Sequence, residues 1–201
     1  MSIKRLSGAG LTTPKSNKLW DQTTFQSGMF ALATVSLTTT ATSVVFDNIP
    51  SNYTHLQLRI TARDNAGSGT PTYIKLTFNS DAGSNYTYHR VFSDGATVYS
   101  DGGTGLAQTY INFALANSST TQIMGASITD VLDYANTSKA KTIRNLGAAD
   151  QSGSGRVGLA SGAWYKNTAS VYEAISKVTL VADTGTFGAN SHFALYGIKA
   201  A

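Results

Sequence analysis

The most regular feature of the chain is an alternation of apolar and polar residues with a period of two. Leu56, Leu58 and Ile60 alternate with Gln57 and Arg59, which is the pattern of an antiparallel strand that buries one face. The same period occurs at 74–78, 177–180 and 193–195, and further strand-like segments lie at 30–38, 42–48, 86–92, 108–115, 122–132, 141–148 and 156–164. Because these segments are short and are separated by Gly, Ser, Asn and Asp clusters, the sequence predicts an all-β, antiparallel β-sandwich.

One polar cluster, residues 79–85, separates a strand that ends at Phe78 from one that begins near Tyr86. Asn and Asp hydrogen-bond to their own backbone in turns and Gly accepts a positive φ, so the cluster is predicted to be a hairpin loop. A calcium site is the alternative, because hard cations prefer several carboxylate and carbonyl oxygens. Asp81 is the only carboxylate in this loop and Asp64 is the only one in the cluster at 64–69, so turns are favoured and no metal site is predicted.

Catalytic groups are sparse and scattered. His55, His89 and His192 lie in separate strand-like segments without a local nucleophile or ligand, and Glu173 is the only glutamate. No nucleophile-elbow, zinc-protease or phosphate-loop motif is present, and the absence of cysteine excludes disulfides and thiolate metal sites. The sequence therefore predicts no enzyme, no catalytic residues and no cofactor.

Exposed aromatic residues could bind sugar, as they do in lectin-like sandwiches. The candidates are Tyr53, Tyr86, Tyr88, Tyr99, Tyr110, Tyr134, Trp164, Tyr165 and Tyr172. Tyr is also an ordinary strand residue with a polar end. Since these residues do not gather in one loop, a structural role is the favoured interpretation.

Charge is low and unevenly distributed. Charged residues make up 13% of the chain, against about 25% in a typical soluble domain. Lys4, Arg5, Lys15 and Lys18 lie in the first 20 residues, whereas all 11 acidic residues and the other 11 of the 15 basic residues follow residue 20. The net charge of +4 thus belongs to the N-terminal segment. This segment lacks interleaved stacking aromatics, so nucleic-acid binding is disfavoured.

The N-terminal segment also carries isolated apolar residues, which are Leu6, Leu11, Leu19, Trp20 and Phe25. Three interpretations are open: a solvated tail, a segment that folds back on the core of its own chain, and an arm that docks on an acidic protein surface. The third interpretation is favoured, and the candidate docking residues are Lys4, Arg5, Lys15, Lys18, Leu19, Trp20 and Phe25. We divide the chain into residues 1–40, an arm with the first strand, and residues 41–201, the β-sandwich. No apolar run is long enough to span a membrane.

Six segments of the chain, taken together and in order, carry a family resemblance. They are "IPSNYTHLQLRITAR" (49–63), "LTFNSDAGSNYTYHR" (76–90), "DYANTSKAKT" (133–142), "GAW" (162–164), "ISKVTL" (175–180) and "FGANSHFALYGIK" (187–199). Over about residues 44–199 the chain resembles a family of tailed-phage virion proteins in which these segments recur in the same order. The family contains free-standing small proteins and the distal domains of longer fibre proteins. The resemblance implies a jelly-roll sandwich displayed on a virus particle, and it implies no catalytic residues.

With this resemblance, we expect a decoration or cement protein on the phage head, located in the virion and made in the host bacterial cytoplasm. No heptads of a fibre shaft accompany the sandwich. A homotrimer is expected, because virion oligomers at symmetry axes form closed rings, and the arm is expected to bind the major capsid protein. The alternative is a tail-fibre or adaptor-associated receptor-binding protein that recognises host glycan.

Overall fold

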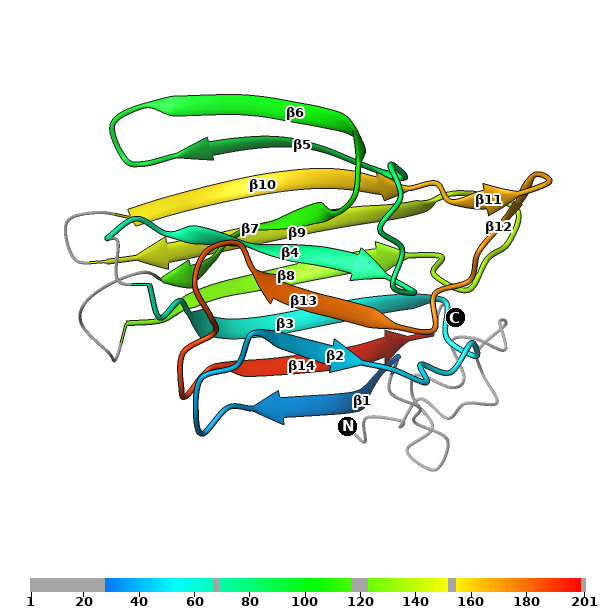
Figure 1. Cartoon of the computed structure of the whole chain (residues 1–201), viewed down its shortest axis with the longest axis horizontal. Helices are drawn as coiled ribbons and strands as arrows, with labels where there is room; N and C mark the ends of the chain where they lie inside the picture. Colours follow the sequence, from blue (N-terminus) through cyan, green and yellow to red (C-terminus); the bar gives the residue numbers. More distant parts are fainter. Residues whose placement is uncertain (1–27, 67–68, 117–122, 152–154, 200–201) are drawn as a thin grey trace, which may run out of the picture.

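The computed structural model describes residues 28–66, 69–116, 123–151 and 155–199, and their regular structure is all β (Figure 1). Fourteen strands form within these ranges, and no helix. The strands are β1 (Met29–Ser36), β2 (Ser43–Phe46), β3 (His55–Arg63), β4 (Thr72–Phe78), β5 (Tyr86–Ser93), β6 (Val98–Leu106), β7 (Thr109–Ala116), β8 (Gly125–Leu132), β9 (Lys141–Asp150), β10 (Gly155–Trp164), β11 (Asn167–Thr168), β12 (Val171–Tyr172), β13 (Val178–Ala182) and β14 (His192–Ile198).

Twelve of these strands form two layers that face each other. The larger layer has the order β1-β14-β3-β8-β9-β10-β5-β6 and the smaller layer has the order β2-β13-β4-β7. All pairs within the layers are antiparallel. The layers join at one corner, where β7 runs parallel to the end of β3 through the pairs Ala62↔Leu115 and Arg63↔Ala116. The predicted antiparallel β-sandwich is confirmed.

The path of the chain between the layers is that of a jelly roll. The chain alternates from β2 in the smaller layer to β3 in the larger one, back to β4, and across again to β5 and β6. It returns through β7, forms the β8-β9-β10 meander in the larger layer, and crosses through β13 to β14. When the meander is counted as one position, the two orders are β2-β13-β4-β7 and β3-(β8, β9, β10)-β5-β6, which are the paired sheets of an eight-stranded jelly roll.

The core lies between the layers and follows the predicted alternation. Leu56, Leu58 and Ile60 of β3 are no more than 2% exposed and face Leu76 and Leu180 of the smaller layer within one hydrophobic cluster. The largest buried side chains of this cluster are aromatic. They are Phe78, Tyr86, Tyr134, Trp164, Phe187 and Phe193.

Strand β7 approaches β9 and β10 so closely that a side chain at Gly147 or Gly158 would not fit between them. A Cβ atom at Gly147 of β9 would overlap the backbone carbonyl of Asn112 in β7. A Cβ atom at Gly158 of β10 would lie 3.2 Å from the side-chain nitrogen of Asn112 and 3.2 Å from the ring of Phe113. At Gly147 the backbone of β9 therefore packs directly against the backbone of β7, and the two layers are closely spaced here.

The loop at 79–85 connects the two layers, so the prediction of a hairpin was wrong. The predicted ends of the flanking strands, Phe78 and Tyr86, are those of the structure. However, β4 pairs with β7 and β13, whereas β5 pairs with β10 and β6. Turn-forming residues suit any tight connection, so their chemistry could not show which sheet the next strand would join.

Strand β6 was not predicted. Its sequence, VYSDGGTGL, has the composition of a turn, with three glycines and an aspartate. It lies at the edge of the larger layer, pairs with β5 alone and is mostly exposed. This strand is defined by its backbone hydrogen bonds to β5. Such bonds do not require apolar side chains, so the sequence of β6 shows no apolar alternation.

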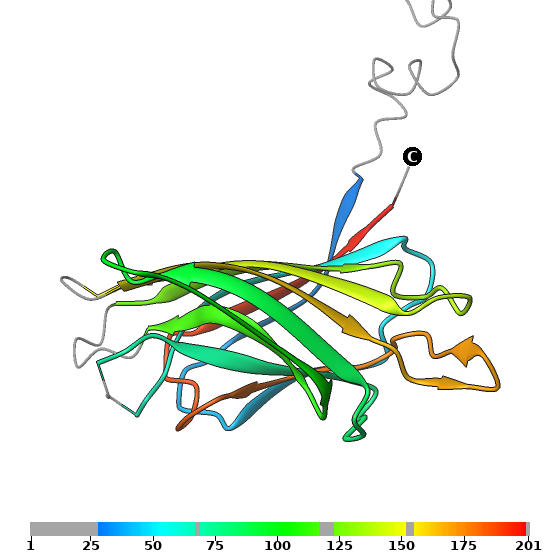
Figure 2. The ribbon, with the colours of Figure 1, turned by 90° about the horizontal axis from the view of Figure 1, so that it is seen from above.

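The first strand, expected within 30–38, is β1 at the other edge of the larger layer. It pairs with β14 from Met29↔Ile198 to Ser36↔His192, and Phe30 packs against the ring of Tyr53 with centroids 5.6 Å apart. The end of the predicted arm, residues 1–40, is thus part of the sheet. Figure 2 shows β1 and β14 extending side by side from the body.

We predict that β1 contributes to stability although it is an edge strand. A chain beginning at residue 41 should still melt cooperatively, but several degrees below a chain beginning at residue 28, which is the first truncation. The reason is that the second truncation removes Leu32 and Val35, which pack on the core. Thermal melts followed by circular dichroism measure this. Equal melting temperatures of the two truncated chains would show that β1 contributes nothing.

We also predict that Gly147→Ala is strongly destabilising. The added methyl group overlaps backbone, which cannot rotate away, so we expect a loss of about 1–3 kcal/mol or more in the free energy of unfolding. Gly28→Ala is the matched control, because a Cβ atom there meets only the carbonyl oxygen of Lys199 at 3.8 Å. Urea unfolding of both variants tests the contrast, and a Gly147→Ala protein as stable as the control would contradict the close contact.

Candidate interaction face

The outward face of the larger layer carries most of the exposed large apolar side chains of the described residues. These are Val91 (43% exposed), Val98 (71%), Ile128 (43%), Leu146 (49%), Val157 (52%) and Leu159 (55%). They come from five adjacent strands, β8, β9, β10, β5 and β6. Single exposed apolar residues are common, but a contiguous group on one face indicates an interaction surface.

Where β9 and β10 pass β7, their larger apolar side chains lie on the outside because β7 occupies the inside. On β9, Asn145 and Gly147 face inward and Leu146 faces outward. On β10, Gly158 faces inward between the exposed Val157 and Leu159. This arrangement reverses the usual one, in which a sandwich strand buries its apolar side chains and exposes its polar ones.

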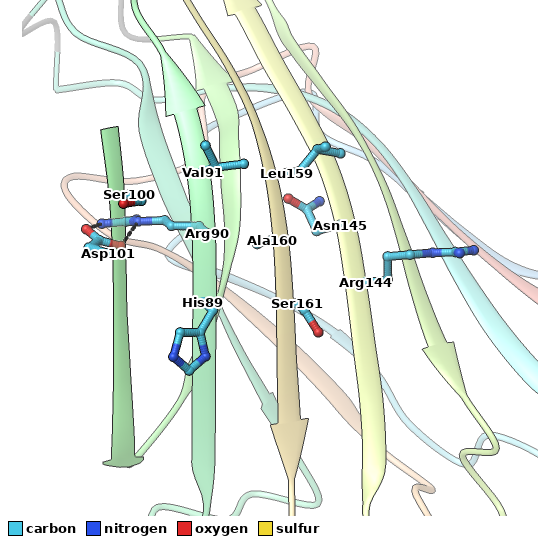
Figure 3. Close-up of a pocket in the computed structure, with 10 residues that line it drawn as sticks. All are labelled: His89, Arg90, Val91, Ser100, Asp101, Arg144, Asn145, Leu159, Ala160 and Ser161. Atoms are coloured by element: carbon cyan, nitrogen blue, oxygen red, sulfur yellow. Dashed lines mark hydrogen bonds and ion pairs between the residues drawn. The ribbon is translucent and has the colours of Figure 1, made fainter. Parts of the chain in front are cut away.

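Strand register aligns four of the apolar side chains in one row across the sheet. Ile128 of β8 pairs with Leu146 of β9, Leu146 pairs with Leu159 of β10, and Leu159 pairs with Val91 of β5. Arg59 of β3 and Ser100 of β6 continue the row at its two ends. We call Ile128, Leu146, Leu159 and Val91 the apolar row. Figure 3 shows Val91 and Leu159 side by side on neighbouring strands, above an open depression that His89 and Ser161 also line.

A polar row runs beside the apolar row and is displaced from it by two residues along each strand. Its members, in order across the sheet, are Gln57, Asp130, Arg144, Ser161 and His89. Asp130 accepts hydrogen bonds from the amide of Gln57 at 2.8 Å and from the guanidinium of Arg144 at 2.7 Å. The Arg144 side chain is 69% exposed and that of Asp130 is 15% exposed, so this ion pair adds little stability and the guanidinium of Arg144 is accessible to a partner.

Arg90 and the residues that contact it, which we call the Arg90 cluster, connect the two layers where β5 lies near β4. The Arg90 side chain is only 11% exposed and forms a two-point ion pair with Asp101, at 2.5 and 2.6 Å (Figure 3). Its guanidinium lies 4.3 Å from the ring centroid of Tyr73 and 5.1 Å from that of Tyr88. Burial lowers the pKa of Arg90, but the hydrogen bonds and charge of Asp101 outweigh this and raise it, so Arg90 stays charged.

The Arg90 cluster gathers aromatic residues that are scattered in the sequence. Tyr73 contacts Phe113 and Tyr110, Tyr88 contacts Tyr110, and Phe92 contacts Tyr99, with ring centroids 5.0–6.1 Å apart. Tyr99 is 41% exposed. No local sequence pattern indicates this grouping, because the rings come from four strands of two layers. Of the other sugar-binding candidates, Tyr86, Tyr134 and Trp164 are buried in the core, while Tyr53, Tyr165 and Tyr172 are partly buried elsewhere.

Asp81, the residue on which a calcium site was considered, is a buried structural acceptor. Its carboxylate accepts hydrogen bonds from the indole N–H of Trp164 at 2.7 Å, from the Asn85 side chain at 3.0 Å and from the Gly83 backbone at 3.0 Å. Burial raises the pKa of Asp81, but these hydrogen bonds together outweigh it and hold the pKa below its ordinary value. The loop is thus tied to β10 through Trp164.

Asp64 has a similar structural role. It is fully buried and accepts hydrogen bonds from the hydroxyl groups of Thr72 and Thr184, at 3.1 and 2.7 Å, and from the backbone of Ala66 at 2.8 Å. Over the described ranges, no three His, Asp or Glu side chains come together as metal ligands.

The three histidines lie on three different strands. His55 of β3 accepts a hydrogen bond from the Asp133 backbone at 2.9 Å, and His192 of β14 lies 2.9 Å from the hydroxyl of Ser36. His89 of β5 is exposed on the outward face of the larger layer. The three histidines do not come together, and the hydroxyl group beside His192 is that of Ser36.

The predicted docking residues Lys4, Arg5, Lys15, Lys18, Leu19, Trp20 and Phe25 lie outside the described residues. Their role stays a prediction. Sequence reasoning missed the apolar row, although the two-residue period around Leu146 and Leu159 is a possible signal for it. That period says that one face is apolar, but it does not say whether this face is the inner one.

Comparisons with protein-family models, with curated proteins and with solved structures found no significant match. Along the described parts of the chain, no helix is long and apolar enough to cross a membrane. The residues themselves must therefore carry the functional argument.

We predict that Asp81→Asn destabilises the protein by about 1–3 kcal/mol, because an amide cannot accept from every donor that points at this site. The loss should depend on pH. A carboxyl group with a lowered pKa in the folded state stabilises above its unfolded pKa of about 3.9, and this contribution is lost as the pH falls through the folded value. The difference between the two proteins should therefore shrink on acidification.

Unfolding free energies measured between pH 2.5 and pH 7 test this, with Asp47→Asn at an exposed position as the control. A constant difference between Asp81→Asn and the unaltered protein over this range would mean that the charge of Asp81 is not what holds the loop.

Proposed function

We propose that this protein is a non-enzymatic structural protein of a tailed-phage particle, and that it decorates the surface of the head. The observation that carries the proposal is the apolar face of the larger layer. This sheet exposes the apolar side chains of Ile128, Leu146, Leu159 and Val157. Such a surface favours stable contact with another protein over exposure to water. A protein that functions inside an assembly has a use for such a face.

Two further features support this proposal. The jelly-roll path is the architecture implied by the resemblance to phage virion proteins, and jelly rolls are common in viral capsids. The side chains with hydrogen-bonding or catalytic potential that the sequence offers, such as Asp81, Asp64 and His55, have structural partners in the fold. The docking of residues 1–40 on a major capsid protein and the homotrimer stay predictions within this proposal.

The second candidate function is a tail component that recognises host glycan. The observation that favours it is the Arg90 cluster, because stacked aromatic rings beside an arginine and an aspartate resemble a sugar-binding surface. Only Tyr99 of these rings is more than 40% exposed, however, while Arg90 is largely buried. The cluster is accounted for by its role in joining β5 to β4, so we rank this function below the first.

Copy number in purified virions tests the proposal. Quantitative mass spectrometry against labelled peptides of this chain and of the major capsid protein should give hundreds of copies per particle for a head decoration protein. A few to a few dozen copies would instead favour the tail component. Absence of the chain from purified particles would overturn both.

A further inference from the structure

The outward face of the larger layer has the size of a protein interface. Six strands, β3, β8, β9, β10, β5 and β6, lie side by side. With strands about 4.8 Å apart and about eight residues of about 3.3 Å each, the face measures about 25 by 26 Å. That area is close to the roughly 800 Å² that each partner buries in a standard interface. A face of this size can bind a partner whether the protein belongs to the head or to the tail.

The charges on this face do not suit the N-terminal segment of the same chain. Arg59 and Arg144 are the exposed cations beside the apolar row, the carboxylate of Asp130 is already paired with Arg144, and the exposed Asp150 lies at the end of β9. The segment before residue 21 carries four basic residues and no acidic one. A basic segment lying along the apolar row would meet Arg59 and Arg144 with only the paired Asp130 beside them, so a partner with an almost neutral surface is the better fit.

The order of polar and apolar positions along the apolar row and its two ends is the same when it is read from either end. From Arg59 it runs Ile128, Leu146, Leu159, Val91 and then Ser100, so four apolar side chains lie between two polar ends. The centre of the row falls between β9 and β10. A surface that matches its own reversed copy is what a two-fold contact requires, since the same patch is used on both chains.

Consider a two-fold axis that lies in the plane of the face, parallel to the strands and between β9 and β10. It places Leu146 opposite Leu159 of the second copy, and Ile128 opposite Val91 of the second copy. Strands of the two copies then run in similar directions, which is the geometry of aligned sheet packing, with faces about 10 Å apart. Each apolar side chain of the row meets another apolar side chain.

The neighbouring rows fit the same operation. In the polar row, Asp130 lies opposite His89 of the second copy, and Arg144 lies opposite Ser161 of the second copy. On the other side of the apolar row, Ala148 lies opposite Val157 of the second copy, because these residues are also register partners on β9 and β10. No two side chains of like charge lie opposite each other, so electrostatic repulsion does not oppose this contact.

We propose that the outward face of the larger layer is a homodimer interface, in which a second copy of this chain packs across a two-fold axis between β9 and β10. The contact buries the apolar row of both copies. It differs from the three-fold ring expected from the sequence, and the mass of the protein in solution separates the two.

The test uses the full chain. Native mass spectrometry and light scattering over a range of concentrations should give twice the chain mass of 21.1 kDa. Leu159→Asp should raise the dimer dissociation constant about 100-fold or more, because it places a charge at the centre of the contact. Val171→Asp is the matched control, since Val171 is 57% exposed on β12, outside this face, and it should leave the dimer intact.

Cross-linking tests the axis, since the chain has no native cysteine. A short bis-maleimide should join an Ile128→Cys protein to a Val91→Cys protein in an equimolar mixture far more than it joins either protein to itself. A monomer, a trimer, or a dimer that Leu159→Asp leaves unchanged would overturn the proposal. If Leu159→Asp fails to fold by circular dichroism, Leu146→Asp and the cross-linking pair decide in its place.

Discussion

The close approach of β7 to β9 and β10 is the constraint on which the rest of the structure depends. The backbone of Asn112 in β7 packs against Gly147. The backbone N–H of Asn112 donates a hydrogen bond to the side-chain oxygen of Asn145 at 2.9 Å. The side chain of Asn145 in turn donates to Thr129 of β8 at 2.9 Å. Here polar groups, rather than a hydrophobic layer, hold the sheets together, because a strand at this distance excludes larger side chains.

The outer surface follows from this inner contact. Since β9 and β10 have only small or polar residues where they face β7, the large apolar side chains of this part of the two strands, such as Leu146 and Leu159, lie on the outside. The exposed apolar face is therefore built into the way the jelly roll closes, and it links the architecture to the assembly role that we propose. The meander that widens the larger layer also makes this face broad enough for a partner.

The loops differ from this exposed apolar face, because their polar side chains form hydrogen bonds within the fold. Asp81 and Asp64, which could have marked ion sites, accept three or more hydrogen bonds from groups close in space. A buried carboxylate is stable only with such donors. Trp164 and Thr184, two of these donors, lie more than 80 residues away from their acceptors in the sequence.

The sequence by itself determined the strands that bury side chains. The two-residue period at Leu56–Leu58–Ile60 and at Leu180 follows from alternation across a sheet, which is a local property, and the strand ends at Phe78 and Tyr86 follow from local turn chemistry. Only the tertiary structure decided that β4 and β5 belong to different layers, that the glycine-rich β6 is a strand, and that Leu146 and Leu159 face outward. Each of these depends on pairing or contact between residues distant in the chain, and a local pattern does not record which of its two faces will meet another strand.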